Sequence, residues 1–128
     1  MTIADFIGLT YENKGRTLKG VDCYGLYILF NKLMLNRTIP EYGYAHAEDA
    51  NAVHCAFTYN ERKWIDVTDA PQLGDLIMFK IAGRVVHCGV YINKSEFLHT
   101  LAGRNCTIEP LDSVTWVRRK YKVIRWQT

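Results

Sequence analysis

The hydrophobic periodicity of the chain changes at about residue 63, and this change restricts the folds that the chain can adopt. Before that point apolar residues recur at helical spacing, and after it they alternate with polar residues in short runs. Helices followed by a series of short strands are typical of α+β proteins, in which an antiparallel sheet packs on the helices. We therefore predict an α+β fold with N-terminal helices packed on an antiparallel sheet.

The first half of the sequence predicts three helices. Thr2, with Asp5 three residues later, forms a capping-box-like start for a short helix. The main helix follows Asp22, which is a favourable N-cap residue, and NRTIPEYGY (36–44) ends it through Asn36, Pro40 and Gly43. A weaker helical pattern begins at Ala50, whereas residues 11–20 are polar and are predicted to form a loop. The main helix carries a single apolar stripe made of Leu26, Leu29, Phe30, Leu33 and Met34.

The second half predicts short β-strands separated by turn sequences that contain glycine, asparagine and aspartate. The strand-like runs are DLIMFKI (75–81), RVVHCGVYI (84–92), EFLHTL (96–101) and YKVIRW (121–126). Because only NKS (93–95) separates the second run from the third, these two strands are expected to form a hairpin through NKSE.

Composition excludes several classes of protein. The 128 residues suit one compact domain over residues 1–128, with 48% hydrophobic and 23% charged residues. A net charge of +3 is too small to indicate a nucleic-acid partner. The longest apolar stretch is interrupted by Asn31 and Lys32, so no membrane insertion is expected. The N-terminus lacks the features of a signal peptide, and we expect the thiols to stay reduced in a cytosol.

Four cysteines occur without the CxxC spacing of zinc modules, and we predict no metal site and no cofactor. Cys23 differs from the others because it follows the predicted N-cap and lies in the first turn of the main helix. The positive end of a helix favours a thiolate, which is the nucleophilic form of cysteine. Cys55, Cys88 and Cys106 are predicted to fill core space.

A nucleophilic cysteine needs a base, and His87 is the candidate. Strand alternation places His87 and Gly89 on one face, while Val86 and Cys88 lie on the other. In the expected hairpin, His99 orients the ring of His87 and completes a Cys–His–polar triad. The alternative interpretation is that Cys23 is a buried small residue and that both histidines are hydrogen-bonded strand residues.

Three blocks of the sequence resemble the NlpC/P60 cysteine peptidases, and together they cover nearly the whole chain. VDCYGL resembles the DCSGL block of that family. LGDLIMFKIAGRVVHCGVYIN is similar to the GDLVFF…HVGIYIG block, and FLHT is similar to FIHA. Upstream, GLTYENKG resembles the G-x-x-Y-x-x-G-G approach to the nucleophile.

The resemblance implies a papain-like fold and hydrolysis of peptide bonds in peptidoglycan stem peptides, often next to D-glutamate and without a metal. It implies that Cys23 is the nucleophile, His87 the general base and His99 the orienting residue. It also implies that Tyr11 lies near the oxyanion and that Asp22 binds the free amine of the stem peptide.

Two positions depart from the family pattern. Tyr24 replaces the serine of the DCSG block, and its ring is expected to contact substrate and narrow the cleft. The upstream glycine pair is absent, because Gly15 and Gly20 are separated.

The compact form, with PQLGDLIMFKIAGR and IEPLDS…WVRR, is most similar to versions in the tail assembly and tail-tip proteins of tailed bacteriophages. This similarity implies tail-tip partners, and a location in the host cytoplasm during assembly and then in the virion tail. The alternative is a papain-like tail assembly protein without catalysis, and a third option is an acyltransferase or amidase that uses the same triad.

Overall fold

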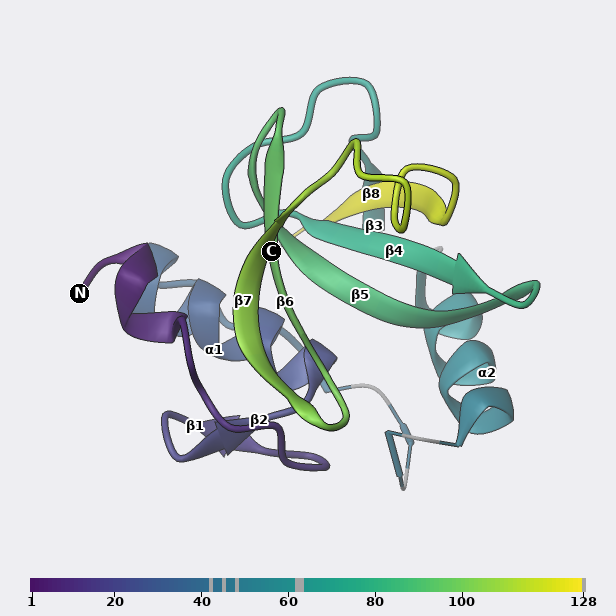
Figure 1. Ribbon diagram of the computed structural model, residues 1–128. Coiled ribbons are helices and arrows are strands. Elements are labelled where there is room, and N and C mark those ends of the chain that lie inside the picture. The colour runs from purple at the N-terminus through teal and green to yellow at the C-terminus, as the bar shows by residue number, and fades with distance from the viewer. Residues whose placement is uncertain (42, 45, 48, 62–63, 128) are drawn as a thin grey trace.

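The structure is a computed structural model that describes residues 1–41, 43–44, 46–47, 49–61 and 64–127 (Figure 1). The elements are the 3₁₀ helix η1 (Ile3–Phe6), β1 (Arg16–Thr17), β2 (Gly20–Val21), α1 (Cys23–Leu35), α2 (Ala50–Glu61), β3 (Trp64–Asp66), β4 (Leu76–Ile81), β5 (Arg84–Asn93), β6 (Glu96–Leu101), β7 (Arg104–Pro110) and β8 (Lys120–Trp126). Helices precede the main strands along the chain, which confirms the predicted α+β class.

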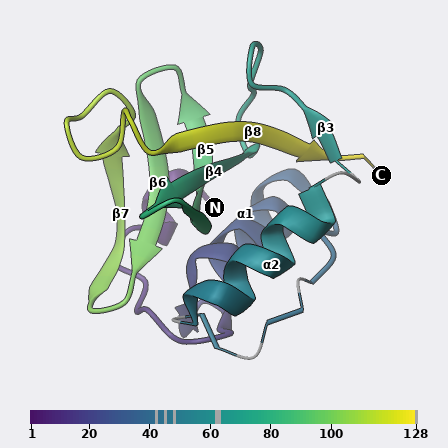
Figure 2. The same cartoon turned by 90° about the vertical axis from the view of Figure 1, so that its right-hand side faces the viewer.

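Most of the strands form one antiparallel sheet. In the described part of the chain, six strands pair in the order β3-β8-β4-β5-β6-β7. Figure 2 shows both helices, with α2 in front of α1, below β8 and β4 of this sheet. The predicted packing of N-terminal helices on an antiparallel sheet is therefore confirmed. The expected β5–β6 hairpin also forms, with Tyr91 opposite Phe97 and Asn93 opposite Glu96.

Helix α1 begins and ends where the sequence indicates. The carboxylate of Asp22 accepts a hydrogen bond from the Gly25 N–H at 2.7 Å, and Asn36 ends the helix with a left-handed φ of 53°. The predicted apolar stripe is wrong at Leu33, which is 39% exposed, whereas Tyr27 is buried outside that stripe. The reason is that α1 is covered on more than one side, by the sheet and by α2. No helix in the described residues is long and apolar enough to cross a membrane.

The sheet buries residues on both faces. Along β4, Leu76 and Met78 pack with the helices, while Ile77 and Phe79 belong to a second apolar cluster. The second cluster is completed by Phe97, Trp116 and Val123. Because successive side chains of a strand point to opposite faces, the segment that carries Trp116 covers the face opposite the helices.

Three local predictions are wrong. Residues 11–20 contain part of a short hairpin, since Arg16 pairs with Val21. Strands β3 and β7 were not predicted, because β3 has three residues and β7 has only two apolar positions, Cys106 and Ile108, among polar ones. Cys55 is exposed on α2 and does not fill core space.

Candidate active site

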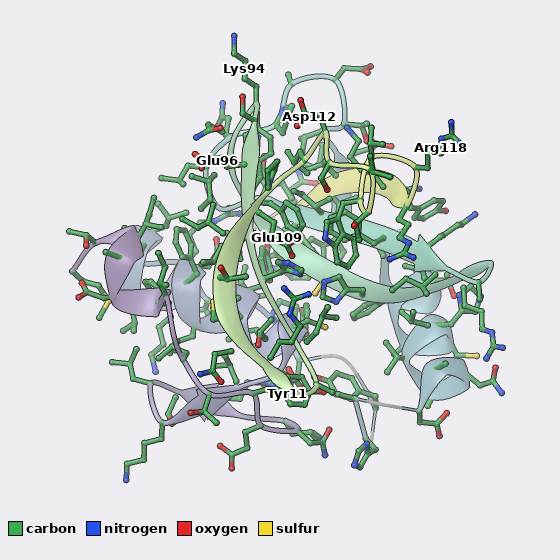
Figure 3. All side chains as sticks on the ribbon, in the orientation of Figure 1. Tyr11, Lys94, Glu96, Glu109, Asp112 and Arg118 are labelled. Atoms are coloured by element: carbon green, nitrogen blue, oxygen red, sulfur yellow. The ribbon has the colours of Figure 1, made fainter. Side chains whose placement is uncertain are left out.

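Three predicted site residues meet at one pocket. Tyr11, Cys23 and His87 line a cavity of about 260 Å³. Figure 3 places Tyr11 near the tip of the β6–β7 hairpin. The other described lining residues are Ala47, Ala50, Ile81, Val86, Thr100, Leu101 and Ala102. The pocket therefore brings together the predicted nucleophile and the predicted base, from distant parts of the chain, beside a mainly apolar wall.

Cys23 is the first residue of α1, where the helix dipole favours a negative charge. The pKa of its thiol is lowered to about 5, first because the Cys88 side chain donates a hydrogen bond to it. Burial opposes this effect, and a hydrogen bond and charge from His87 assist it. Cys23 is therefore a thiolate at neutral pH, which is the nucleophilic form.

Cys88 is a contributor to this site that the sequence analysis did not identify. It is fully buried on β5, as predicted for a core residue, and burial first of all raises the pKa of its thiol well above the usual value. Cys88 therefore keeps its proton and donates a hydrogen bond to the sulfur of Cys23. The feature of the sequence that could have identified Cys88 as a site residue is its position directly after His87.

A β-bulge lies in β5 next to the pocket. Val85 lies opposite Lys80 and His87 lies opposite Phe79, so Val86 is an extra residue without its own partner on β4. A bulge bends the strand and changes the direction of its side chains, and the neighbours Val86 and His87 both line the pocket. After the bulge the ladder is regular, with Cys88 opposite Met78, so His87 and Cys88 lie on opposite faces as predicted.

A chain of buried hydrogen bonds extends from His87. Nε2 of His87 lies 2.8 Å from Nδ1 of His99, and both residues are almost fully buried. Nε2 of His99 in turn contacts Oε2 of Glu109, and this oxygen also accepts a hydrogen bond from Nε1 of Trp116 at 3.2 Å. We call His87, His99 and Glu109 the histidine relay. Figure 3 shows Glu109 on β7, the edge strand of the sheet.

The electrostatics of the relay favour a neutral His99. Burial, followed by the charge of His87, lowers the pKa of His99 to about 4, and the hydrogen bond to Glu109 opposes this shift only in part. Because β7 was not predicted, the sequence analysis had no reason to place Glu109 near the histidines. Within the described residues, no group of three or more His, Cys, Asp or Glu side chains could hold a metal ion.

Asp22 lies next to Cys23 in sequence, but its carboxylate is fully buried. Oδ1 accepts hydrogen bonds from Gly25 N–H at 2.7 Å and from Nη1 of Arg16 at 2.9 Å. Oδ2 accepts from Lys14 N–H at 2.8 Å and from the Tyr44 hydroxyl at 2.7 Å. Both oxygens are thus satisfied within the protein, and neither is exposed to bind a substrate amine as the resemblance implied.

Arg16 links this carboxylate to a second acid. Nε of Arg16 donates to Oε2 of Glu41 at 2.8 Å, and its Nη2 donates to Oε1 of Glu41 at 2.9 Å. Nη2 also donates to the hydroxyl of Tyr44 at 2.8 Å. We call Asp22, Arg16, Tyr44 and Glu41 the Asp22 network.

The expectation that Tyr24 narrows the cleft is wrong. Its ring is fully buried, 5.9 Å from the ring of Tyr27 and 6.0 Å from that of Phe57. Its hydroxyl donates to the carbonyl oxygen of Pro40 at 2.5 Å. One residue along a helix corresponds to a rotation of about 100°, so the neighbour of Cys23 faces the core and not the pocket.

The missing glycine pair has a structural explanation. Counted from Tyr11, the pair falls on Lys14 and Gly15, and Lys14 adopts a left-handed φ of 58°. The backbone therefore keeps a conformation that glycine favours. Gly15 remains necessary, because a Cβ there would lie 2.2 Å from the carbonyl oxygen of Gly20.

Comparisons with known proteins agree with this geometry. The profile of the NlpC/P60 family matches residues 8–125. The chain is 26% identical over 116 residues to the murein DD-endopeptidase MepS/murein LD-carboxypeptidase of Escherichia coli K12, covering 91% of this chain and 55% of that protein. The chain thus spans about half the length of this relative.

Solved structures show the same fold. An NlpC/P60 family protein from Bacillus cereus superposes with a TM-score of 0.70 at 26% identity, over 94% of this chain and 36% of that one. The NlpC/p60 domain of the peptidoglycan hydrolase SagA gives a TM-score of 0.62 at 16% identity, over 96% and 94% of the two chains. The profile match spans most of the sequence, and the chain belongs to the NlpC/P60 family.

Proposed function

We propose that the chain is a cysteine peptidase that hydrolyses a peptide bond in the stem peptides of bacterial peptidoglycan. The observation that carries this proposal is the Cys23 thiolate, paired with His87 at a pocket and backed by His99. Two similar proteins are named as a murein endopeptidase and a peptidoglycan hydrolase, and these names support the choice of substrate.

The first half of the reaction forms an acyl-enzyme. The sulfur of Cys23 attacks the carbonyl carbon of the scissile bond, and the carbonyl oxygen becomes negatively charged. The backbone N–H of Cys23 at the start of α1 and the hydroxyl of Tyr11 stabilise this oxygen. Protonated His87 then gives its proton to the leaving nitrogen, the C–N bond breaks, and a thioester remains on Cys23.

Water completes the reaction. Neutral His87 removes a proton from a water molecule, whose oxygen attacks the thioester carbonyl. The C–S bond breaks, the carboxylic acid product leaves, and the Cys23 thiolate faces protonated His87 again. Nε2 of His87 contacts His99. Nδ1 of His87 is therefore the nitrogen that gives and takes the proton in both halves of the reaction.

The pocket and Asp22 define the substrate further. Apart from Cys23 and His87, the described lining residues are uncharged and mainly apolar. Asp22 has no exposed oxygen for an amine. We therefore propose that the residue attacked by Cys23 is small and uncharged, and that a free N-terminal amine is not required.

We also propose that the protein acts as a component of a phage tail, together with tail-tip proteins, during penetration of the cell wall. The similarity of residues 71–84 and 108–119 to tail proteins supports this proposal. It implies that the chain is present in the host cytoplasm during assembly and later in the virion. Proteomic analysis of purified particles tests it, because absence of the chain from intact virions would contradict a tail location.

A paired digest tests the peptidase. Purified peptidoglycan is treated with wild type or with Cys23→Ala, and the released peptides are identified by mass spectrometry. New fragments are expected from wild type alone, with a loss in the variant of roughly 10⁴-fold or more. Cys55→Ala, which changes an exposed cysteine on α2, is the matched control. Cleavage by Cys23→Ala would exclude the mechanism, and no cleavage by folded wild type would favour the non-catalytic tail protein.

A further inference from the structure

Glu109 holds the outer end of the histidine relay and has a second hydrogen-bond donor on the same oxygen. Oε2 of Glu109 contacts Nε2 of His99 and accepts from Nε1 of Trp116. The side chain of Glu109 is 22% exposed, and that of His99 is 2% exposed. An indole N–H is only a donor, and a glutamate that is ionised at neutral pH is only an acceptor. These roles fix the direction of the hydrogen bonds at this end of the relay.

The direction at Glu109 determines every proton position in the relay. His99 is neutral at neutral pH and carries a single N–H, which faces the acceptor Glu109 from Nε2. Its Nδ1 is therefore an acceptor, and Nε2 of His87 must be the donor across the 2.8 Å contact. The remaining nitrogen of His87, Nδ1, is the one left for Cys23, and it carries the proton when His87 donates to the thiolate. Without a fixed acceptor at position 109, the opposite tautomer of His99 becomes accessible.

The aromatic surroundings keep the relay in this geometry. The ring of Trp116 lies 5.2 Å from that of His87 and 5.0 Å from that of His99, measured between centroids. Phe97 packs 4.5 Å from His99 on the same face. In this low-polarity environment, a hydrogen bond to a charged carboxylate is stronger than in water.

We propose that Glu109 is a positioning residue that fixes the tautomer of His99 and, through it, directs Nδ1 of His87 toward Cys23. The inference rests on the proposed peptidase function but concerns a residue outside the Cys–His–His set. Glu109 is not among the described residues that line the pocket. Its carboxylate is linked to the base by the hydrogen bonds through His99.

Two variants separate the two properties of Glu109. Glu109→Ala removes the acceptor, so His99 is expected to lose its single tautomer. Glu109→Gln keeps an acceptor oxygen but removes the charge, so the tautomer is retained while the charge that stabilises protonated His87 is lost. Glu96→Gln is the matched control, because this carboxylate on the neighbouring strand β6 accepts a hydrogen bond from Asn93.

The measurements do not depend on cleavage of peptidoglycan. ¹⁵N NMR of the histidine rings reports which nitrogen of His99 carries the proton. The rate of alkylation of Cys23 by iodoacetamide, followed against pH, reports the thiolate–imidazolium pair. The charged or titratable groups that influence the two histidines are Glu109 and Arg104 on β7, and Cys23 on α1. We expect Nε2–H in wild-type His99, mixed tautomers in Glu109→Ala, and alkylation midpoints at higher pH in both variants.

On peptidoglycan, Glu109→Ala is expected to lower kcat/KM by about 10- to 100-fold, the range for loss of one hydrogen bond to a charged group. Glu96→Gln should retain wild-type values in all three assays. The proposal is overturned if wild-type His99 carries its proton on Nδ1, or if both Glu109 variants match Glu96→Gln in tautomer and alkylation profile. If peptidoglycan is not cleaved by any protein, the NMR and alkylation results still decide the role of Glu109.

Discussion

Two buried polar groups of residues flank Cys23, and they differ in the kind of charge that they hold. The histidine relay contains His99, whose pKa is lowered to about 4 by burial and by the charge of His87, and it leads to His87, the proposed base beside the Cys23 thiolate. In the Asp22 network, burial would lower the pKa of Arg16, but Glu41 and Asp22 raise it above its usual value. A buried group that can lose or gain a proton near a nucleophile is suited to chemistry. A permanent, fully paired charge is suited to holding the backbone.

The comparison predicts that substitution of Asp22 lowers the free energy of unfolding strongly, whereas substitution of its neighbour Cys23 hardly changes it. This difference is the largest effect on stability that we expect. Asp22→Ala leaves Arg16 without its buried partner and removes the N-cap of α1. We expect the free energy of unfolding to fall by about 3 kcal/mol, as for one partner of a buried ion pair. Cys23→Ala should change it by less than about 1 kcal/mol, because few contacts are lost. Urea denaturation followed by circular dichroism measures both.

Either of two results would contradict this comparison. If Asp22→Ala unfolded at the urea concentration of wild type, the Asp22 network would not stabilise the fold. If Cys23→Ala were the less stable of the two variants, the division between chemistry and stability would be wrong.

A second prediction sharpens the description of the relay side. Cys88→Ala removes the hydrogen bond that contributes most to the low pKa of Cys23. We expect the midpoint of iodoacetamide alkylation of Cys23 to move upward from pH about 5 in wild type. An upward shift of about one pH unit is a reasonable size for the loss of one hydrogen bond to the charged form. Mass spectrometry of labelled peptides measures the rate at each pH.

Cys106→Ala is the matched control, because Cys106 is also buried and its pKa is raised to about 12 by burial. This substitution also removes one buried sulfur atom, but from a residue that is not among those lining the pocket. Equal midpoints in wild type and both variants would show that Cys88 contributes packing alone.

The smallest effect is expected at the exposed end of the Asp22 network. The hydrogen bond from Arg16 holds the pKa of Glu41 below its usual value, and the Glu41 side chain is 57% exposed. Solvent screens such a pair, so Glu41→Gln should cost only about 0.5 kcal/mol at neutral pH. A depressed pKa contributes stability above the unfolded value, and this contribution is lost as pH falls through the folded value.

Thermal unfolding at a series of pH values tests this sign. The difference between wild type and Glu41→Gln should be constant near neutrality, should begin to shrink near about pH 4, where the carboxyl of an unfolded chain becomes protonated, and should disappear below the lowered pKa of Glu41 in the folded protein. A difference that grows as the pH falls would contradict the assignment of Glu41 to an ion pair with Arg16.

Much of the fold follows from local rules that operate along the sequence. The change of periodicity indicated helices before strands, Asp22 and Asn36 marked the ends of α1, and the short NKSE turn indicated the hairpin that brings His87 to His99. Each of these features depends on residues close together in the chain.

The sequence by itself determined the family, the α+β architecture, and the pairing of Cys23 with His87 and His99 as candidates. Only the tertiary structure decided what surrounds them. Glu109 lies on a strand with weak alternation, where it contacts His99. Cys88 reaches Cys23 because α1 packs against β5. Contacts of this kind depend on the register between distant segments. Because one residue of shift in a strand reverses every side chain, local patterns cannot specify them.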